Sequence, residues 1–226
     1  MWTRILVFRE RIPSGDNLYY IKSAKISESV GDISGSAIEK ARRARLIAWD
    51  IETSGLDWKN NRIGTCQVYI PGDKIYIVLI NDCTPHNLKL LLTNNDICKI
   101  FHHATFDLRF MTHNWSIKTQ NVVCTKIASK ILNPSMKDHS LKNILSQYLG
   151  ITISKEMRLT NWTTSNLSSN QIKYAATDVF YLPRLFDALK YALINCDRWD
   201  LAEASFAYLP TRVELDILGS RDVFIY

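Results

Sequence analysis

The chain has 226 residues, enough for one domain with a substantial core, and we expect residues 1–226 to form a single domain. Hydrophobic residues make up 46% and charged residues 22%, a composition that excludes a disordered or fibrous chain. No apolar run is long enough to span a membrane, so no membrane partner is expected. The net charge of +6 suits a polyanionic partner but is equally ordinary for a basic soluble protein. Five scattered cysteines without a C-x-x-C pair indicate reduced thiols and a cytoplasmic location.

The periodicity of apolar residues changes along the chain, from strands to alternating helix and strand and then to helices. The expected strands cover residues 3–8, 18–21, 46–52, 63–70, 74–80 and 97–101. The expected helices cover residues 36–45, 88–92, 105–115, 125–132, 141–149, a long segment after 168 and 198–208. Ser168 and Gln171 fit a capping box at the start of the long helix, and Pro183 would kink or split it. The pattern predicts an α/β fold with a mixed sheet flanked by helices.

Two carboxylates end the apolar run at 46–52. In a strand, Asp50 and Glu52 point to one face, whereas Trp49 and Ile51 point the other way into packing. Such close like charges repel each other unless a cation lies between them. A metal site is one interpretation of this strand end, and a solvated end with two unrelated acids is the other.

Two further segments each place a carboxylate on a regular element. Asp107 lies near a helix N-terminus, where a carboxylate also stabilises the helix as a cap. Tyr174 and Asp178 are four residues apart, so a helix places the phenol and the carboxylate on one face. Ala175 and Ala176 between them leave room for another element or a ligand to approach.

Four carboxylates from three separated segments suit a pair of divalent cations. Mg²⁺ and Mn²⁺ prefer oxygen ligands, and two such ions stabilise the attacking and the leaving oxygen in phosphodiester cleavage. The expected metal ligands are Asp50, Glu52, Asp107 and Asp178. Tyr174 completes the expected catalytic set, because its phenol can orient the attacking water or assist its deprotonation.

The segments 50–53, 102–107 and 174–178 resemble the three motifs of the DEDDy 3′-5′ exonucleases, in their ribonuclease D branch. The segments 123–130 and 208–219 are similar to the short nano-RNase C subgroup, which lacks the helical RNA-binding domains of full-length ribonuclease D. The resemblance implies a ribonuclease H-like (DnaQ-like) fold. It covers residues 46 to about 189, and within the single domain we expect an N-terminal arm and helix at 1–45, an exonuclease core at 46–190, and a C-terminal helix and tail at 191–226.

The subgroup implies a two-metal 3′-5′ exoribonuclease that acts on short RNA down to dinucleotides, releases 5′-monophosphates and assembles into homo-oligomeric rings. By this resemblance Asp50, Glu52 and Asp178 would hold the ion that activates water, and Asp50 would bridge to a second ion. Asp107 would act through water or the second ion. The substrate-binding residues it implies are Thr53, Leu56, His102, His103, Phe106, Lys155 and Trp162, with Arg158 beside them.

Several of these interpretations have alternatives. Core packing explains Leu56 and Phe106 about as well as contact with a terminal base. His102 and His103 either contact the scissile phosphate or, more commonly for histidines, have a structural role. On their polar loop, Lys155, Arg158 and Trp162 either hold phosphate and stack on a base, or form a surface loop in which Trp162 packs. His103 stands where the wider family often has Asn, and residues 1–40 are longer than expected for the subgroup. Three other functions remain open: ribonuclease D-like trimming of longer RNA, exonuclease action on single-stranded DNA, and a non-catalytic RNA-binding module.

Overall fold

The protein is described by a computed structural model that covers residues 24–154, 157, 159–220 and 223–225. The strands expected at 3–8 and 18–21 lie outside these residues. Along the described chain the strands are β1 (Ile26–Val30), β2 (Leu46–Thr53), β3 (Ile63–Tyr69), β4 (Ile75–Leu79), β5 (Cys98–Phe101) and β6 (Val122–Cys124). The helices are α2 (Gly35–Ala44), α3 (His86–Thr93), α4 (Ala104–Trp115), α5 (Thr125–Leu132), α6 (Leu141–Leu149), α7 (Ser169–Phe180), α8 (Leu182–Asn195) and α9 (Trp199–Ile217).

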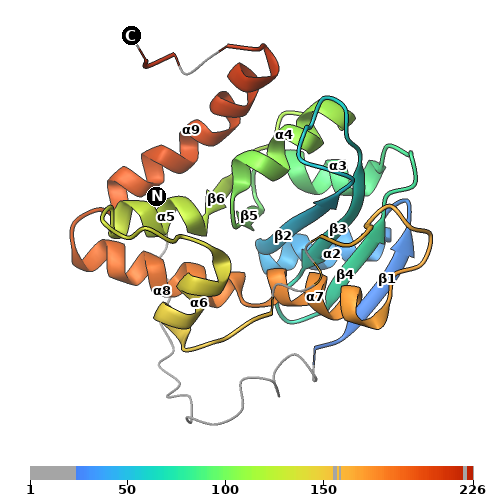
Figure 1. Cartoon of the computed structure of the whole chain (residues 1–226), viewed down its shortest axis with the longest axis horizontal. Coiled ribbons are helices and arrows are strands. Elements are labelled where there is room, and N and C mark those ends of the chain that lie inside the picture. Colours follow the sequence, from blue (N-terminus) through green and yellow to red (C-terminus); the bar gives the residue numbers. More distant parts are fainter. Residues whose placement is uncertain (1–23, 155–156, 158, 221–222, 226) are drawn as a thin grey trace.

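The strands form one mixed sheet in the order β1-β4-β3-β2-β5-β6 (Figure 1). The pairs β2–β3 and β3–β4 are antiparallel, and β3 and β4 are joined by the short connection that the sequence predicted, whereas a longer polar loop joins β2 to β3. The pairs β2–β5, β5–β6 and β1–β4 are parallel. The α/β class and the mixed sheet are therefore confirmed.

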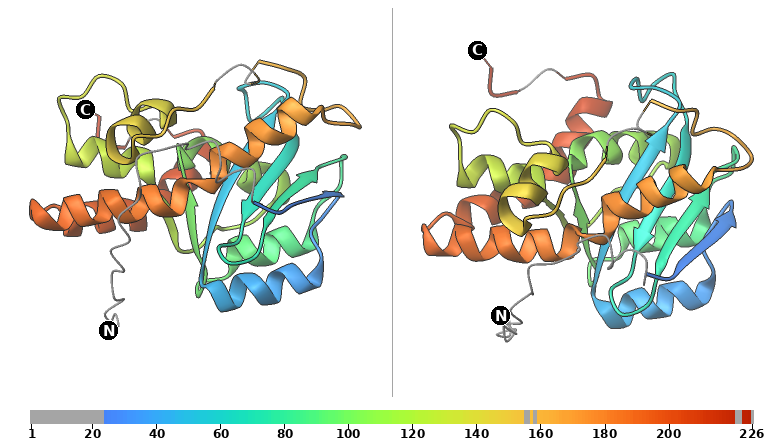
Figure 2. Two further views of the ribbon diagram at one scale, coloured as in Figure 1. Left: turned by 90° about the horizontal axis from the view of Figure 1, so that it is seen from below. Right: turned by 60° about the horizontal axis from the view of Figure 1, so that its bottom comes forward.

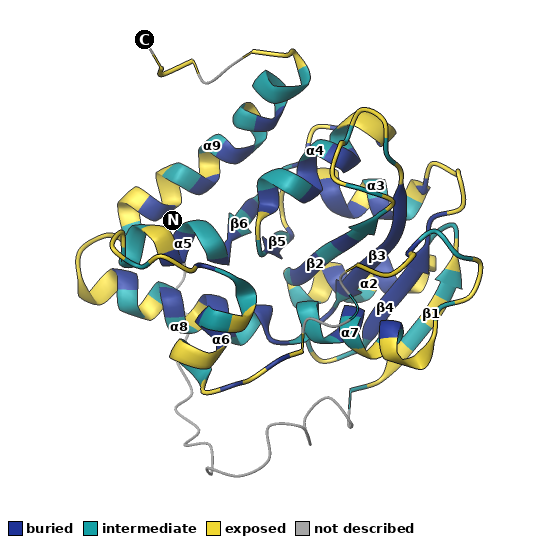
Figure 3. Cartoon of the chain, viewed as in Figure 1, coloured by how far each residue is buried: buried dark blue, intermediate teal, exposed yellow. Residues whose placement is uncertain are grey.

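The sequence prediction missed the two outer strands, β1 and β6. In β1 the side chains alternate between exposed and half-buried and most are polar, so the apolar signal is weak. With only three residues, β6 is too short to show a period. The edge position of β1 is visible in Figure 3, where β3 and β4 are buried and β1 is not.

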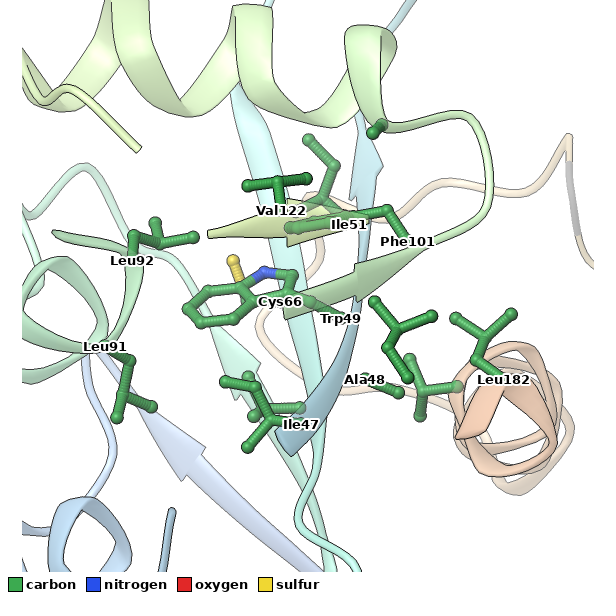
Figure 4. Close-up of a cluster of buried hydrophobic side chains, with 14 of the residues drawn as sticks. Ile47, Ala48, Trp49, Ile51, Cys66, Leu91, Leu92, Phe101, Val122 and Leu182 are labelled. Carbon is green, nitrogen blue, oxygen red and sulfur yellow. The ribbon is translucent and has the colours of Figure 1, made fainter. Parts of the chain in front are cut away.

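The helices cover the sheet on both faces, and Figure 2 shows α2 and α3 on one side and α7 across the other. Trp49 and Ile51 point to the first side, where Trp49 lies beside Cys66 with Leu92 nearby (Figure 4). Trp49 is fully buried, so truncating it to alanine would cost about 3–5 kcal/mol. Ala48, Asp50 and Glu52 alternate with Trp49 and point to the other side of the sheet, toward α7. Tyr69 pairs with Ala48, and its ring lies 5.3 Å from that of Phe180 at the end of α7.

An acidic side chain outside α3 caps this helix. Pro85 at its N-terminus makes no side-chain cap. Instead, Asp32 accepts hydrogen bonds from the backbone N–H groups of Asn87 at 2.6 Å and Leu88 at 3.0 Å. The carboxylate satisfies two otherwise unpaired donors and faces the positive end of the helix dipole. It therefore ties the segment after β1 to the start of α3.

The helices after β6 follow the predicted order, with one correction. Pro183 separates α7 from α8, and the capping box of Ser168 and Gln171 is present. The last helix was predicted to end at Tyr208 but continues to Ile217. Its buried stripe extends past Pro210 through Leu209 and Val213, so packing against the core outweighs the hydrogen bond that the proline removes. Within the described ranges, no helix combines the length and apolar character needed to cross a bilayer.

Candidate active site

Three carboxylates from two elements meet on the face of the sheet that α7 covers. Asp50 and Glu52 project from β2 and Asp178 from α7, and oxygen atoms of the three side chains lie within 4.8 Å of one another. Ala175 and Ala176 are fully buried, which lets α7 approach the sheet closely enough for this meeting. The three side chains are half-buried and so remain open to a ligand.

Asp107, the fourth predicted ligand, lies beside this group but deeper in the protein. It occupies the first turn of α4 and is 2% exposed. Its Oδ1 accepts a hydrogen bond from the backbone N–H of Ile51 at 3.2 Å, between the two carboxylates of β2. The predicted set is thus adjacent in space, with Asp107 anchored to the strand that carries Asp50 and Glu52.

The electrostatics of the cluster favour a bound cation. Burial raises the pKa of Asp50 well above its ordinary value, and the charges of Asp107, Asp178 and Glu52 raise it further. Burial also raises the pKa of Asp107 and brings that of Asp178 to about 7. Like charges held together in this way are balanced by a divalent cation with oxygen ligands.

Tyr174 lies one helical turn before Asp178 and donates a hydrogen bond to its carboxylate. Burial, followed by the charges of Asp178 and Glu52, raises the pKa of the Tyr174 hydroxyl. The phenol therefore stays protonated at neutral pH and can orient a water molecule through hydrogen bonds. Its ring lies 5.9 Å from that of Trp162.

The two histidines of the second motif have structural surroundings. Nδ1 of His102 is 2.9 Å from the hydroxyl of Thr125, and the ring also bonds with the backbone of His139. Burial lowers the pKa of His102 to about 3, so the ring is neutral at physiological pH. His103 lies in the left-handed region with φ 85°, just before α4. Burial and the charge of Lys126 lower its pKa to about 4.

The structure distributes the other predicted substrate-binding residues differently. Leu56 is 84% exposed in the loop after β2, as a residue that meets a base would be. Thr53 donates to the carbonyl of Gly55 at 2.6 Å, and Phe106 packs against the ring of Phe110. Trp162 is only 1% exposed, so it offers no open ring for stacking on a base and contacts Tyr174 instead. Lys155 and Arg158 lie outside the described residues.

Two buried polar residues next to the carboxylates were not predicted. The register of β2 and β3 places Gln67 opposite Asp50 and Thr65 opposite Glu52. Both are fully buried, and Nε2 of Gln67 donates to the hydroxyl of Thr65 at 2.6 Å. Among the described residues, Oε1 of Gln67 has no hydrogen-bond partner. The signal for this pair was the polar interruption of the apolar run 63–70, which only the strand register relates to the carboxylates.

Comparison with protein families agrees with these positions. The model of a 3′-5′ exonuclease family matches residues 32–194. DNA polymerase I of Aquifex aeolicus is 32% identical over 181 residues, which are 78% of this chain and 28% of the relative. Ribonuclease D of Haemophilus influenzae is 28% identical over 165 residues, 72% of this chain and 40% of the relative. The chain thus spans less than half the length of these curated relatives.

Two solved structures match a larger share of this chain than these curated relatives do. Brucella melitensis NrnC bound to pGG is 35% identical with a TM-score of 0.84, and the match covers 90% of this chain and 100% of NrnC. NrnC with bound Mg²⁺ gives a TM-score of 0.82 and covers 89% of this chain and 98% of NrnC. Escherichia coli RNase D, at 23% identity and a TM-score of 0.71 over 79% of this chain and 47% of the enzyme, shares the fold. The chain therefore belongs to the 3′-5′ exonuclease family with the DnaQ-like fold, in the ribonuclease D branch and near the NrnC-like subgroup, as its motifs predicted.

Proposed function

We propose that the protein is a metal-dependent 3′-5′ exoribonuclease that hydrolyses very short RNA and releases 5′-monophosphates. The observation that carries this proposal is the meeting of Asp50, Glu52 and Asp178 within 4.8 Å, in a chain of the exonuclease family. The similarity to NrnC bound to pGG over its whole length supports a short substrate. Free thiols at all five cysteines support a cytoplasmic location.

The residues present fit divalent cations. The donor set consists of carboxylate oxygens, which suit Mg²⁺ or Mn²⁺, and the mutual repulsion of the carboxylates is relieved by positive charge. We propose that Asp50, Glu52 and Asp178 hold one cation and that Asp50, aided by Asp107, reaches a second. When bound, such ions stabilise the charge on the attacking and leaving oxygens of a phosphodiester.

The protein's own groups perform the positioning. Tyr174, fixed on Asp178 by its hydrogen bond, would hold the attacking water in line with the scissile phosphorus. Asp107 holds β2 through the N–H of Ile51 and so fixes the spacing of Asp50 and Glu52. Leu56 on its exposed loop would pack against the terminal base. The remaining candidates Thr53, His103 and Phe106 would line the path of the RNA.

We also propose that the protein is a homo-oligomer. Apolar side chains after α9 are highly exposed, with Leu218 at 78%, Phe224 at 67% and Ile225 at 76%. An apolar group of this kind is better buried in a subunit contact than left in water. If the contact closes a ring, it would restrict access to the site and so favour short RNA.

A single assay tests the function. The purified protein is incubated with end-labelled RNA and DNA of two, seven and twenty nucleotides, with Mg²⁺, with Mn²⁺ or with EDTA. We expect cation-dependent release of 5′-monophosphates from the 3′ end, fastest for the dinucleotide RNA. Asp50→Asn should reduce cleavage by at least about 10²-fold, because it removes the charge of the bridging ligand with little change in shape.

The other candidate functions give different results. Undiminished cleavage in EDTA or by the Asp50→Asn variant would contradict the metal mechanism. Faster cleavage of the twenty-nucleotide RNA would favour ribonuclease D-like trimming, and preference for the DNA series would assign the site to DNA. RNA binding without any cleavage would indicate a non-catalytic module.

A further inference from the structure

A β-bulge lies beside the carboxylates and brings a distant loop onto the sheet. Glu52 pairs with Thr65 and Thr53 pairs with Ile63, so Gly64 is the extra residue of the bulge. A Cβ atom added at Gly64 would lie 2.7 Å from the carbonyl carbon and 3.2 Å from the Cβ of Trp162. Ordinary contact begins at 3.4 Å. Only glycine therefore lets the backbone of Trp162 rest directly on β3.

The same loop has a second anchor at the start of α7. The side-chain Nε2 of Gln171 donates hydrogen bonds to the backbone carbonyl of Asn161 at 2.9 Å and to the hydroxyl of Thr160 at 3.2 Å. Its amide oxygen accepts from the backbone N–H and the hydroxyl of Ser168, which completes the capping box. Both ends of one side chain are thus occupied, one in starting the helix and the other in holding residues 160–162.

These anchors fix the ring of Trp162 against Tyr174. The Trp162 ring is 1% exposed and lies 5.9 Å from the ring of Tyr174. Its indole N–H is buried and has no hydrogen-bond partner among the described residues. Within these residues, packing and the two backbone anchors hold the ring in place. Gln171 lies one turn before Tyr174 on the same side of α7.

We propose that Gly64, Trp162 and Gln171 are positioning residues that hold the hydroxyl of Tyr174 on Asp178 and so orient the attacking water. The inference rests on the proposed function, in which Tyr174 orients that water. It assigns the buried Trp162 to the geometry of the phenol, not to stacking on a base. A displacement of about 1 Å at a reacting group is enough to reduce turnover by up to about 10²-fold. The overlap at Gly64 requires a shift of about this size.

Two variants perturb the clamp formed by Gly64, Trp162 and Gln171 without touching the metal ligands. Gly64→Ala pushes the Trp162 backbone off the sheet. Gln171→Glu keeps an oxygen for the capping box but removes the donor to the carbonyl of Asn161. Gly35→Ala is the matched control, because a Cβ there meets nothing within 4 Å. Each change is also made in the Tyr174→Phe background, and kcat and KM for a dinucleotide RNA are measured with the unfolding temperature.

We expect Gly64→Ala and Gln171→Glu to lower kcat by about 10-fold or more, with KM changed by less than about twofold. In the Tyr174→Phe background the same changes should alter kcat by less than about twofold, because the group they position is gone. Gly35→Ala should match the wild type. If Gly64→Ala does not fold, Gln171→Glu carries the test alone. Unchanged kcat, a change confined to KM, or full additivity with Tyr174→Phe would overturn the proposal.

An independent measurement separates this inference from the proposed function. The ring signals of Tyr174 in ¹³C-tyrosine-labelled protein are assigned by their loss in Tyr174→Phe. We expect them to shift in Gly64→Ala and Gln171→Glu and to stay in place in Gly35→Ala, because the Trp162 ring moves relative to the phenol. Failure of the wild type to cleave RNA would refute the proposed function alone. Unmoved Tyr174 signals in both variants would refute the clamp, whatever the substrate.

Discussion

Replacing Asp178 with asparagine should stabilise the metal-free protein at pH 8 while removing its activity. Burial raises the pKa of Asp178 from 3.8 to about 7, so the folded protein binds a proton more tightly than the unfolded chain does. Stability must then fall as the pH rises from about 4 to about 7, because ionisation is easier in the unfolded state. Asparagine cannot ionise and still accepts the hydrogen bond from Tyr174.

The structure sets the size of the effect. A shift of this size corresponds to at most about 4 kcal/mol of differential stability. Because Asp178 is only half-buried by its exposed surface, we expect about 1–2 kcal/mol. For a chain of this length, that free energy raises the unfolding temperature by roughly 2–8 °C. Asp50 contributes to the same loss of stability with rising pH, because burial raises its pKa and the charges of Asp107 and Asp178 raise it further.

Thermal unfolding at pH 5 and pH 8, with EDTA or with Mn²⁺, tests the reasoning. In EDTA the variant should exceed the wild type at pH 8, and the difference should be much smaller at pH 5, which lies closer to the unfolded pKa of Asp178. With Mn²⁺ at pH 8 the order should reverse, because the ion stabilises the protein that binds it more tightly. The control is Asp73→Asn. Burial alone would raise the pKa of Asp73, but hydrogen bonds from Lys40 and Tyr76 outweigh it and lower the pKa. Removing this carboxylate charge should therefore destabilise the protein at pH 8. A variant less stable than the wild type at pH 8 in EDTA would refute the argument.

Three other outcomes follow from the same structure. Tyr174→Phe should lower kcat by about 10²- to 10⁴-fold and leave RNA affinity nearly unchanged in a binding assay, whereas equal activity would make the residue a packing element. Light scattering should show a homo-oligomer, and cleavage kinetics should give the highest kcat/KM for RNA of two to five nucleotides. A monomer that cleaves a twenty-nucleotide RNA faster than a dinucleotide would contradict this. Asp32→Ala should lower the unfolding free energy by about 1–2 kcal/mol in urea titrations, because two N–H groups of α3 lose their acceptor; a change below about 0.3 kcal/mol would contradict the capping role.

Local patterns predicted those parts of the fold and site that local chemistry determines. The alternation in β2 separates Asp50 and Glu52 from Trp49, and the i,i+4 spacing pairs Tyr174 with Asp178. The capping box at Ser168 needed only four residues to be recognised. Each of these features is set by a strand or helix period, and each appears where it was expected.

The residues whose roles the sequence left open depend on contacts between distant segments. For Trp162 the polar loop around it left two interpretations open, stacking on a base and packing under a surface loop, and the structure shows the packed ring. Its burial depends on the bulge at Gly64, 98 residues earlier, and the irregular pairing of β2 with β3 leaves no periodic trace. For His102 a structural role was the favoured interpretation over contact with phosphate, but the sequence could not name its partners Thr125 and the backbone of His139, because they lie beyond α4.

The departure of His103 from the family pattern has a conformational explanation. The residue lies at φ 85°, just before α4, where asparagine and histidine are better tolerated than most side chains. Its ring lies 6.1 Å from that of Phe106, nearly parallel to it. The ring stays neutral at physiological pH, because burial and Lys126 lower its pKa to about 4. The position thus demands a backbone conformation that both residues supply, and the chain can carry histidine there while Asp107, one turn into α4, keeps its contact with β2.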